Sequence, residues 1–464
     1  MRRLFIIFMF LSDLLSAQGN RADLFGFNTN TLFIFMDIYD TNSLNLVKQI
    51  SPKVLRFPGG YGNFYHVNGS GYGFNYNEAF QNNNGNLPKR LKGINRIIGQ
   101  KNHKNNYLDD FIYLAKKLNS KVIIDANILT ANFDETFEII TRLQENGLDI
   151  RGVEIGSELY NASFQKSIDA VRYVKLAKLF SNKLFSSFPN IDIAVVVAPL
   201  NRNYNRHKEW NQLLANEDFY DAIIIHTYAK VIKGLDVEGQ MIKEVPENLN
   251  DTLTFEIYRE RALKFLYKSY EDEIIKYSLM FNNKPIWVTE WNIQMSKTTG
   301  NTMFQSLFVS TYVLELLANK KLNHVELAIY HNLAGRDISG SIFRETNTGM
   351  ETHSTFYSFK IISKIFKQEI KSVTRRKINE HCYEYLCVFA DLSEEYIWIN
   401  WSDQVVDINL REEVSCSKLY FFGDQLFSKN STDDELRYIK EKNSSGSSIS
   451  LNPYSVTMIE NIIK

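Results

Sequence analysis

Hydrophobic and polar positions change their period repeatedly along the first 366 residues. Short apolar runs rich in Val and Ile end in polar residues or glycine, a pattern that predicts β-strands. Most of these runs are followed by segments with apolar residues at helical spacing, such as Leu108–Leu118, Ser167–Ser186 and Phe255–Phe281. Eight strands are predicted, and they begin near Gly26, Val54, Val122, Val153, Ile191, Ala222, Ile286 and Val325.

Strands that alternate with helices predict a parallel sheet in an α/β fold. Several runs, such as Ile191–Ala198, are apolar almost throughout, as strands buried on both faces must be. Eight strand and helix pairs fit a (β/α)8 TIM barrel. An open, doubly wound sheet has the same local pattern and is the alternative. No Gly-x-Gly-x-x-Gly follows the first strand, which argues against a dinucleotide-binding fold.

The pattern changes from about Lys367 onward, where short apolar segments are separated by turn residues and no convincing helix is present. We therefore predict a signal peptide at 1–17, a catalytic (β/α)8 barrel at 18–366 and an antiparallel β-sandwich at 367–464. The expected strands of the sandwich are Cys382–Ala390, Tyr396–Asn400, Val405–Leu410, Lys418–Phe422, Ser448–Leu451 and Val456–Ile462.

The N-terminus has the three features of a secretion signal. The chain starts with MRR, continues with the apolar run Leu4–Leu11, and reaches a small-residue cleavage site at Ser16–Gln18. The apolar run is too short to cross a bilayer, and no membrane span is predicted elsewhere. The alternative is that this segment forms a buried first strand or helix. With a cleaved signal, the protein is expected to be secreted or periplasmic.

Charge and composition narrow the classes of ligand. Lys plus Arg and Asp plus Glu both number 53, so the whole chain has no positive field for nucleic acid or an anionic membrane. Aromatic residues make up 13% of the sequence, and sugar rings are one flat surface on which they stack. The 8 His residues form no metal-ligand motif such as HExxH, and neither a metal nor a cofactor is predicted. The sequence does not indicate the oligomeric state.

Three cysteines lie near the C-terminus, at Cys382, Cys387 and Cys416. Neither their number nor their spacing matches a disulfide framework or a zinc site. One disulfide bond that includes Cys416 and three buried thiols are the two alternatives.

Two glutamates lie at the ends of predicted strands, where the catalytic residues of barrel enzymes are found. Glu158 follows the fourth predicted strand, and Glu290 lies at the end of the seventh. The C-terminal ends of barrel strands meet around one opening. Two carboxyl groups about 5–5.5 Å apart can cleave a glycosidic bond with retention, one as proton donor and the other as nucleophile. Glu158 and Glu290 are therefore the predicted catalytic pair.

Other residues at strand ends are predicted to support this pair or to bind substrate. Arg56 is expected to hold Glu290 ionised through a charge-assisted hydrogen bond. His226 and Tyr228 are expected to contact Glu290 or the sugar, although a histidine in an apolar strand is also common in cores. Tyrosines of the long segment 61–106 are candidates for sugar stacking, and solvated loop packing is the alternative. The other predicted substrate-binding residues are Asn127, Ser157, Trp291, Asn292 and Tyr330.

Four short motifs occur in the order and position of a known family. RFPGG at 56–60, EIGSE at 154–158, HTY at 226–228 and TEWN at 289–292 resemble the retaining (β/α)8-barrel glycosidases of glycoside hydrolase clan A, in particular the α-L-arabinofuranosidase, β-xylosidase and heparanase-type branches. LNPYSVT at 451–457 is similar to the last strand of their β-sandwich. The resemblance implies that Glu158 is the acid/base and Glu290 the nucleophile, with Arg56 and Tyr228 supporting Glu290.

The sequence departs from the family pattern at two positions. The family usually has Asn directly before the acid/base, where this chain has Ser157, and an aromatic platform, commonly Trp, where this chain has Tyr330-His331-Asn332. We expect a retaining hydrolase that acts on an oligo- or polysaccharide. The alternative is a carbohydrate-binding protein without turnover, for which Ser157 is the only argument.

Overall fold

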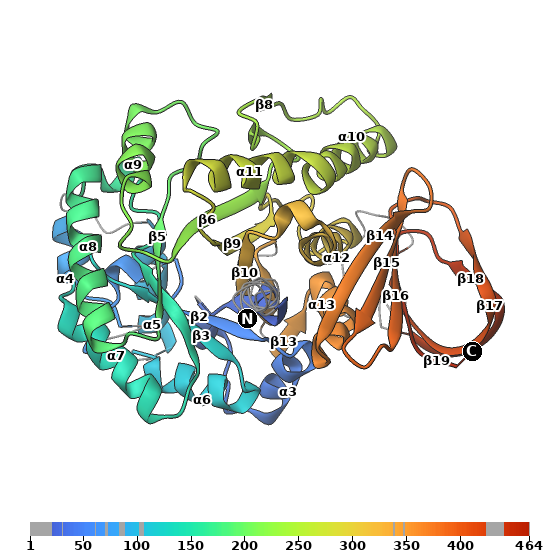
Figure 1. Cartoon of the computed structure of the whole chain (residues 1–464), viewed down its shortest axis with the longest axis horizontal. Coiled ribbons are helices and arrows are strands. Elements are labelled where there is room, and N and C mark those ends of the chain that lie inside the picture. Colours follow the sequence, from blue (N-terminus) through green and yellow to red (C-terminus); the bar gives the residue numbers. More distant parts are fainter. Residues whose placement is uncertain are drawn as a thin grey trace, which may run out of the picture.

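The structure is a computed structural model of the chain, coloured along the sequence in Figure 1. The predicted signal peptide at 1–17 lies outside the residues that it describes. The described residues are 21–29, 31–60, 62–69, 73–82, 89–101, 106–336, 339–346, 349–423 and 440–463.

Parallel strands close into an eight-stranded barrel at the centre of the larger domain (Figure 1). The ring is complete because β1 pairs with β2 on one side and with β10 on the other. This confirms the predicted (β/α)8 barrel and excludes the open, doubly wound sheet. In order around the ring, the strands are β1 (Gly26–Asn28), β2 (Val54–Phe57), β3 (Lys121–Ala126), β4 (Ile150–Ile155), β5 (Asp192–Val196), β6 (Ala222–Ala229), β9 (Ile286–Ile293) and β10 (Val325–Tyr330).

Helices cover the outside of the barrel, and side-chain caps mark where several begin. Asp40, Asn132, Asp169, Asn250 and Thr302 each accept a hydrogen bond from a backbone N–H in the first turn of the helix that follows. In the described ranges, every helix is too short or too polar to span a bilayer. The main helices are α3 (Thr41–Ile50), α6 (Leu108–Leu118), α7 (Phe133–Glu145), α8 (Ala170–Ser187), α9 (Asn205–Ala215), α10 (Asp251–Lys264), α11 (Tyr270–Met280), α12 (Met303–Ala318) and α13 (Ser354–Ile362).

Regular structure also occurs where the sequence pattern predicts long loops. In its described residues, the segment 61–106 contains the α-helices α4 and α5, and α5 is rich in basic and polar residues, so its apolar stripe is hard to recognise. The segment 229–253 contains a short hairpin, and a small sheet follows β10. These elements are α4 (Tyr76–Asn82), α5 (Lys89–Lys101), β7 (Gly234–Leu235), β8 (Met241–Ile242), β11 (Asn332–Gly335), β12 (Ser341–Thr346) and β13 (Gly349–Thr352).

The C-terminal domain is antiparallel, as predicted, and its strand order is β14, β15, β16, β19, β17 and β18. The sheet curls around a core of its own that includes Trp398, Ile408 and Leu451 (Figure 1). One long strand, β17, replaces two predicted short strands and pairs with both β18 and β19. All three cysteines are buried thiols. The strands are β14 (Ile370–Lys377), β15 (Cys382–Phe389), β16 (Glu394–Asn400), β17 (Val406–Phe422), β18 (Lys440–Leu451) and β19 (Ser455–Ile463).

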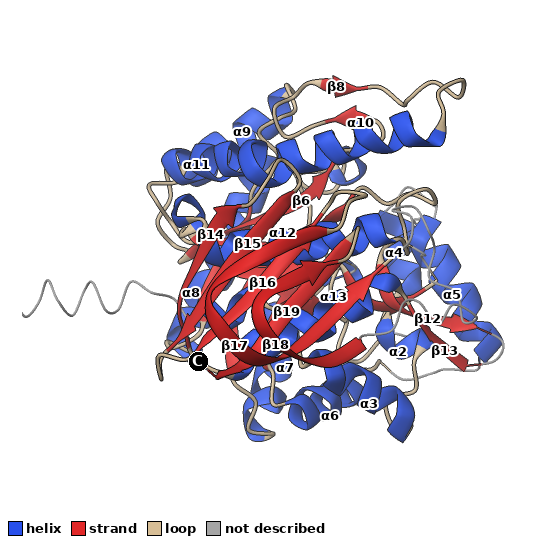
Figure 2. Ribbon diagram, turned by 90° about the vertical axis from the view of Figure 1, so that its right-hand side faces the viewer, coloured by secondary structure: helices blue, strands red, loops and turns tan. Residues whose placement is uncertain are grey.

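Helix α12 joins the two domains, and the C-terminal sheet covers it in Figure 2. All but one of its 16 residues are buried, because barrel strands lie on one side of it and the sheet on the other. The buried Glu315 on this helix accepts hydrogen bonds from the Tyr385 hydroxyl at 2.7 Å and from Arg375 Nη1 at 2.6 Å. The two domains therefore share one hydrophobic core and a polar link across it.

Candidate active site

The two predicted catalytic glutamates come together at the C-terminal end of the barrel. A carboxylate oxygen of Glu158, a carboxylate oxygen of Glu290 and a ring nitrogen of His226 all lie within 4.8 Å of one another. Glu158 follows β4 in a left-handed backbone conformation with φ of 48°, two residues after Gly156, whose φ is 76°. This sharp turn at the strand end places the Glu158 side chain opposite Glu290 on β9.

Glu290 is held on both carboxylate oxygens. Arg56 Nη1 donates to Oε1 at 3.1 Å, and the Tyr228 hydroxyl donates to Oε2 at 2.8 Å. His331 Nδ1 lies 3.5 Å from Oε2, and His226 Nδ1 lies 3.8 Å from it. Burial alone raises the pKa of Glu290, but His226, His331 and Arg56 outweigh it and bring the pKa well below its usual value. Glu290 is therefore ionised at neutral pH.

Glycine at position 60 is needed beside this carboxylate. A Cβ atom on Gly60 would lie 2.9 Å from Glu290 Oε1, closer than side-chain atoms approach each other. The loop after β2 thus brings its backbone against the Glu290 carboxylate, in the RFPGG motif that also carries Arg56.

Arg56 is the centre of a buried charge network that the sequence did not indicate in full. Its Nε and Nη2 donate to the two oxygens of Glu154 at 2.8 and 2.7 Å, and Nη2 lies 3.5 Å from Asp125 Oδ2. Burial lowers the pKa of Arg56, but Glu154, Asp125 and Glu290 outweigh it, so its pKa is raised. Burial has the largest effect on Asp125 and raises the pKa of its carboxyl. Arg56 lowers this pKa, but the charges of Glu154 and Glu290 raise it, and the result is a pKa well above the usual value. Glu154 fixes the guanidinium group through Nε and Nη2, and the remaining nitrogen, Nη1, donates to Glu290.

A signal for Glu154 was present in the sequence. It is a charged residue inside an otherwise apolar strand, and a buried charge needs a partner of opposite sign. The sequence does not identify Arg56 as that partner, because β2 and β4 lie on either side of β3 and only the folded barrel brings the two side chains into contact.

Glu158 has a different environment from Glu290. Its Oε1 lies 3.0 Å from His226 Nδ1, and its Oε2 accepts a hydrogen bond from Asn161 Nδ2 at 2.9 Å. The other ring nitrogen of His226, Nε2, lies 3.1 Å from the Thr289 hydroxyl oxygen. Burial lowers the pKa of His226, but the charges of Glu290 and Glu158 outweigh it and raise the pKa above its usual value. His226 Nδ1 and Glu158 Oε1 are thus joined by one hydrogen bond, next to Glu290.

Ser157 lies directly before Glu158 and is buried. Its hydroxyl accepts a hydrogen bond from Arg56 Nη2 at 3.4 Å, and its backbone N–H donates to Asn63 Oδ1 at 2.9 Å. Asn63 Nδ2 donates in return to the carbonyl oxygen of Ser157. Asn63, which the sequence did not single out, therefore clamps the backbone that carries Glu158.

Two predicted substrate-binding residues on β9 have structural roles instead. Trp291 is 2% exposed and stacks on Tyr312 of α12, with ring centres 4.1 Å apart. Successive side chains of a strand point to opposite faces, so the residue after Glu290 faces the helices. Asn292 is also buried, and its amide donates to the carbonyl oxygen of Ser339 at 2.9 Å.

Asn127 and Tyr330 are corrected in the same way. The Asn127 amide donates to the carbonyl oxygen of Tyr65 at 3.0 Å and to the Thr130 hydroxyl at 2.7 Å, so it shapes the loop after β3. Tyr330 is fully buried, and its ring packs 4.9 Å from that of Phe359. The next residue, His331, reaches the site, where its Nδ1 lies 2.8 Å from the Tyr228 hydroxyl.

The aromatic residues predicted in the segment 61–106 are only partly described. Tyr61 and Tyr72 lie outside the described residues. Tyr65 is buried and packs edge-on against Phe57, with ring centres 5.1 Å apart. Within the described residues, this segment therefore uses Tyr65 in the core and not in the opening of the barrel.

Glu158, His226 and Glu290 are close enough to surround a metal ion, but their hydrogen bonds favour proton chemistry. Both oxygens of Glu290 already accept hydrogen bonds, one of them from the cationic Arg56. A divalent cation at this point would lie beside that guanidinium and be repelled by it. This is a chemical argument against a metal, and the metal-independent site stays a prediction.

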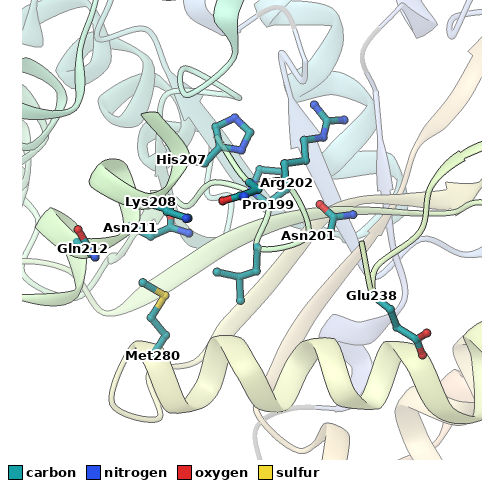
Figure 3. Close-up of a pocket in the computed structure, with 11 residues that line it drawn as sticks. Pro199, Asn201, Arg202, His207, Lys208, Asn211, Gln212, Glu238 and Met280 are labelled. Carbon is teal, nitrogen blue, oxygen red and sulfur yellow. The ribbon is translucent and has the colours of Figure 1, made fainter. Parts of the chain in front are cut away.

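A cavity of about 220 Å³ opens beside the pair and is lined by Glu158, His226 and Tyr228. A neighbouring pocket of about 250 Å³, shown in Figure 3, shares residues of the loop after β5 with this cavity but contains neither glutamate. The cavity beside Glu158 is thus the one that adjoins the reactive groups.

No protein-family model and no curated protein matches the sequence. Solved structures nevertheless share the fold across both domains. An α-L-arabinofuranosidase from Thermotoga maritima, in complex with arabinose, is 14% identical with a TM-score of 0.68, over 96% of this chain and 97% of that chain. A GH51 arabinofuranosidase from Xanthomonas axonopodis pv. citri is 13% identical with a TM-score of 0.65, over 95% and 96% of the two chains. A 4-O-α-L-rhamnosyl-β-D-glucuronidase from Fusarium oxysporum is 11% identical with a TM-score of 0.59, over 95% and 96%. These likenesses confirm the resemblance to clan A glycosidases at the level of fold.

Proposed function

We propose that the protein is a secreted retaining glycoside hydrolase, with Glu290 as nucleophile and Glu158 as acid/base. The pairing of these glutamates carries the proposal, since their oxygens lie within 4.8 Å and their surroundings differ. The Glu290 side chain is 8% exposed and doubly hydrogen-bonded, whereas the Glu158 side chain is 37% exposed beside a cavity. An ionised, fixed carboxylate suits attack on an anomeric carbon, and an accessible one suits proton transfer to a leaving group.

In the first step, Glu290 attacks the anomeric carbon while Glu158 protonates the departing oxygen. The proton comes from the Glu158 and His226 pair, whose Oε1 and Nδ1 atoms are 3.0 Å apart. The resulting glycosyl ester leaves Glu290 without charge. Burial lowers the pKa of His226, and the ester removes the charge of Glu290, which is one of the charges that raise this pKa. In the second step, Glu158 accepts a proton from the water that attacks the ester, and the sugar leaves with its original configuration.

The roles of the two glutamates are tested with activated aryl glycosides and azide. Glu290→Ala should lower kcat on the order of 10⁴-fold or more. Azide should then react in place of the missing carboxylate and give a glycosyl azide of inverted configuration. With Glu158→Ala, Glu290 still forms the ester, so azide should give the retained configuration. Proton NMR of the anomeric signal distinguishes the two products.

The panel begins with α-L-arabinofuranosides, because structures that share this fold include arabinofuranosidases, and continues with xylosides and glucuronides. Sugar binding without product release by the wild-type protein would refute the hydrolase and favour a carbohydrate-binding protein. Equal activity of the wild type and Glu290→Ala would refute the assignment of the nucleophile.

Secretion is tested separately. If the signal is cleaved after Ala17, mass spectrometry of the exported protein should find an N-terminus at Gln18. A protein that keeps Met1 and remains inside the producing cell would contradict the signal peptide.

A further inference from the structure

Two cations line the cavity beside Glu158. Arg202 lies on the loop after β5, and Lys230 directly follows the last residue of β6. In the described part of the chain, neither side chain has a hydrogen bond or an ion pair with a carboxylate. Both side chains therefore remain available to a ligand in the cavity.

The two charges are close enough to influence each other. Burial lowers the pKa of Lys230, and the positive charge of Arg202 lowers it further. The Lys230 ammonium also lies 5.8 Å from the centre of the Tyr228 ring, whose hydroxyl donates to Glu290. Two like charges in one cavity repel each other, and an anion placed between them would be attracted to both.

The acidic residues around the cavity do not pair with Arg202 and Lys230. Glu158 is engaged by His226 and Asn161. Glu273 is buried, which raises the pKa of its carboxyl to about 8, so it is mostly protonated at neutral pH. Glu238 belongs to the adjoining pocket and is paired with Lys264. Figure 3 shows the Arg202 guanidinium pointing away from Glu238.

The backbone that carries both cations is fixed by hydrogen bonds. Asn201 Nδ2 donates to the carbonyl oxygen of Asp236 at 2.6 Å, which ties the loop of Arg202 to the β7 and β8 hairpin. The backbone N–H of Gln294 donates to the carbonyl oxygen of Ala229 at 2.9 Å, which holds the end of β6 directly before Lys230. The two side chains therefore start from defined positions after the neighbouring strands β5 and β6.

We propose that this cavity is the leaving-group subsite and binds a sugar with a carboxylate or sulfate group, which Arg202 and Lys230 attract. The proposal rests on the proposed hydrolysis, because the proton donor Glu158 lines the same cavity. Leu235 and Val237 add an apolar surface against which a ring face can pack. The substrate class is then an acidic oligosaccharide, with the negative charge on the unit that departs.

The test measures binding of free sugars to the full-length protein, so that it does not depend on turnover. Isothermal titration calorimetry compares glucuronic acid, glucose 6-sulfate and glucose. We expect at least one anionic sugar to bind roughly tenfold or more tightly than glucose, a difference of about 1.4 kcal/mol. Added salt should reduce this preference, since it screens the charges. The anion that binds more tightly distinguishes a uronate from a sulfate ester.

Substitutions link this preference to the two cations. Arg202→Gln and Lys230→Gln should each reduce the preference, and the double variant should abolish it. Lys208→Gln is the matched control, because Lys208 is an exposed cation of the adjoining pocket that does not line this cavity. Melting curves establish that each variant is folded before binding is measured.

Equal binding of charged and neutral sugars by the wild type would overturn the anion site. A preference that survives in the folded single and double variants would also overturn it. Absence of hydrolysis in the aryl glycoside panel would count against the proposed function alone, because the calorimetric comparison involves no bond cleavage.

Discussion

Replacing Glu273 with Gln should stabilise the protein by an amount that increases with pH. Glu273 lies on α11, is 7% exposed, and accepts a hydrogen bond from the Thr227 hydroxyl at 3.3 Å. Burial raises the pKa of its carboxyl from 4.5 to about 8. In the unfolded chain the lower value applies. Between these pH values, the folded protein therefore holds a proton that the unfolded chain has lost.

The sign and size of the effect follow from this difference. Where the folded state binds more protons than the unfolded state, the free energy of unfolding falls as pH rises. One pKa unit corresponds to 1.36 kcal/mol, so the rise in the pKa of Glu273 from 4.5 to about 8 corresponds to a loss of about 5 kcal/mol. A glutamine has nearly the same shape, still accepts the hydrogen bond from Thr227, and does not titrate. The Glu273→Gln variant should therefore not lose this free energy of unfolding as the pH rises.

Urea unfolding of the wild type and Glu273→Gln at pH 5, 6, 7 and 8 measures the effect. The buried Trp287 and Trp291 of the barrel provide a fluorescence signal. The free energy of unfolding of the variant, relative to the wild type, should rise by about 1.4 kcal/mol per pH unit. Glu256→Gln, at an exposed position on α10, is the control for removal of a charge. A difference that stays constant from pH 5 to pH 8 would refute the buried, protonated carboxyl.

Three further substitutions test the site and the core. Tyr228→Phe removes the 2.8 Å hydrogen bond to Glu290 and should lower kcat roughly 10- to 100-fold in steady-state assays, with KM little changed. Trp291→Leu should lower the free energy of unfolding by about 3 kcal/mol in urea, and weaker sugar binding without lost stability would contradict its core position. Tyr385→Phe leaves one oxygen of the buried Glu315 without its donor and should cost about 1–3 kcal/mol of stability, so an unchanged melting temperature would speak against this link.

The barrel could be predicted because its strands are strongly apolar and regularly separated by helical segments. Glu158 and Glu290 stand out in this pattern, since both end such runs, and strand counting alone places them at the same opening. The C-terminal domain was recognisable from the loss of helical spacing. Its long strand β17 was not, because turn-forming residues between Leu410 and Lys418 remain in extended backbone.

The predictions for neighbouring residues failed where register decides which face a side chain takes. The register between β6 and β9 shifts just before His226, and the register between β10 and β9 shifts just before Tyr330. A shift of one residue reverses which side chains enter the barrel. Trp291 and Tyr330 face the helices, and His331, the residue after Tyr330, reaches Glu290.

The fold class and the pair Glu158 and Glu290 could be predicted from the amino-acid sequence alone. Hydrophobic periodicity and strand ends are local properties, so they can be recognised without knowing which residues are neighbours in space. The charged residues around that pair could be identified only from the folded structure. Arg56 meets Glu154 across 98 residues of chain and Glu290 across 234, and pKa values depend on such distances. The positions of Arg202 and Lys230 beside Glu158 also depend on the tertiary structure, because loops after two different strands bring them to one cavity.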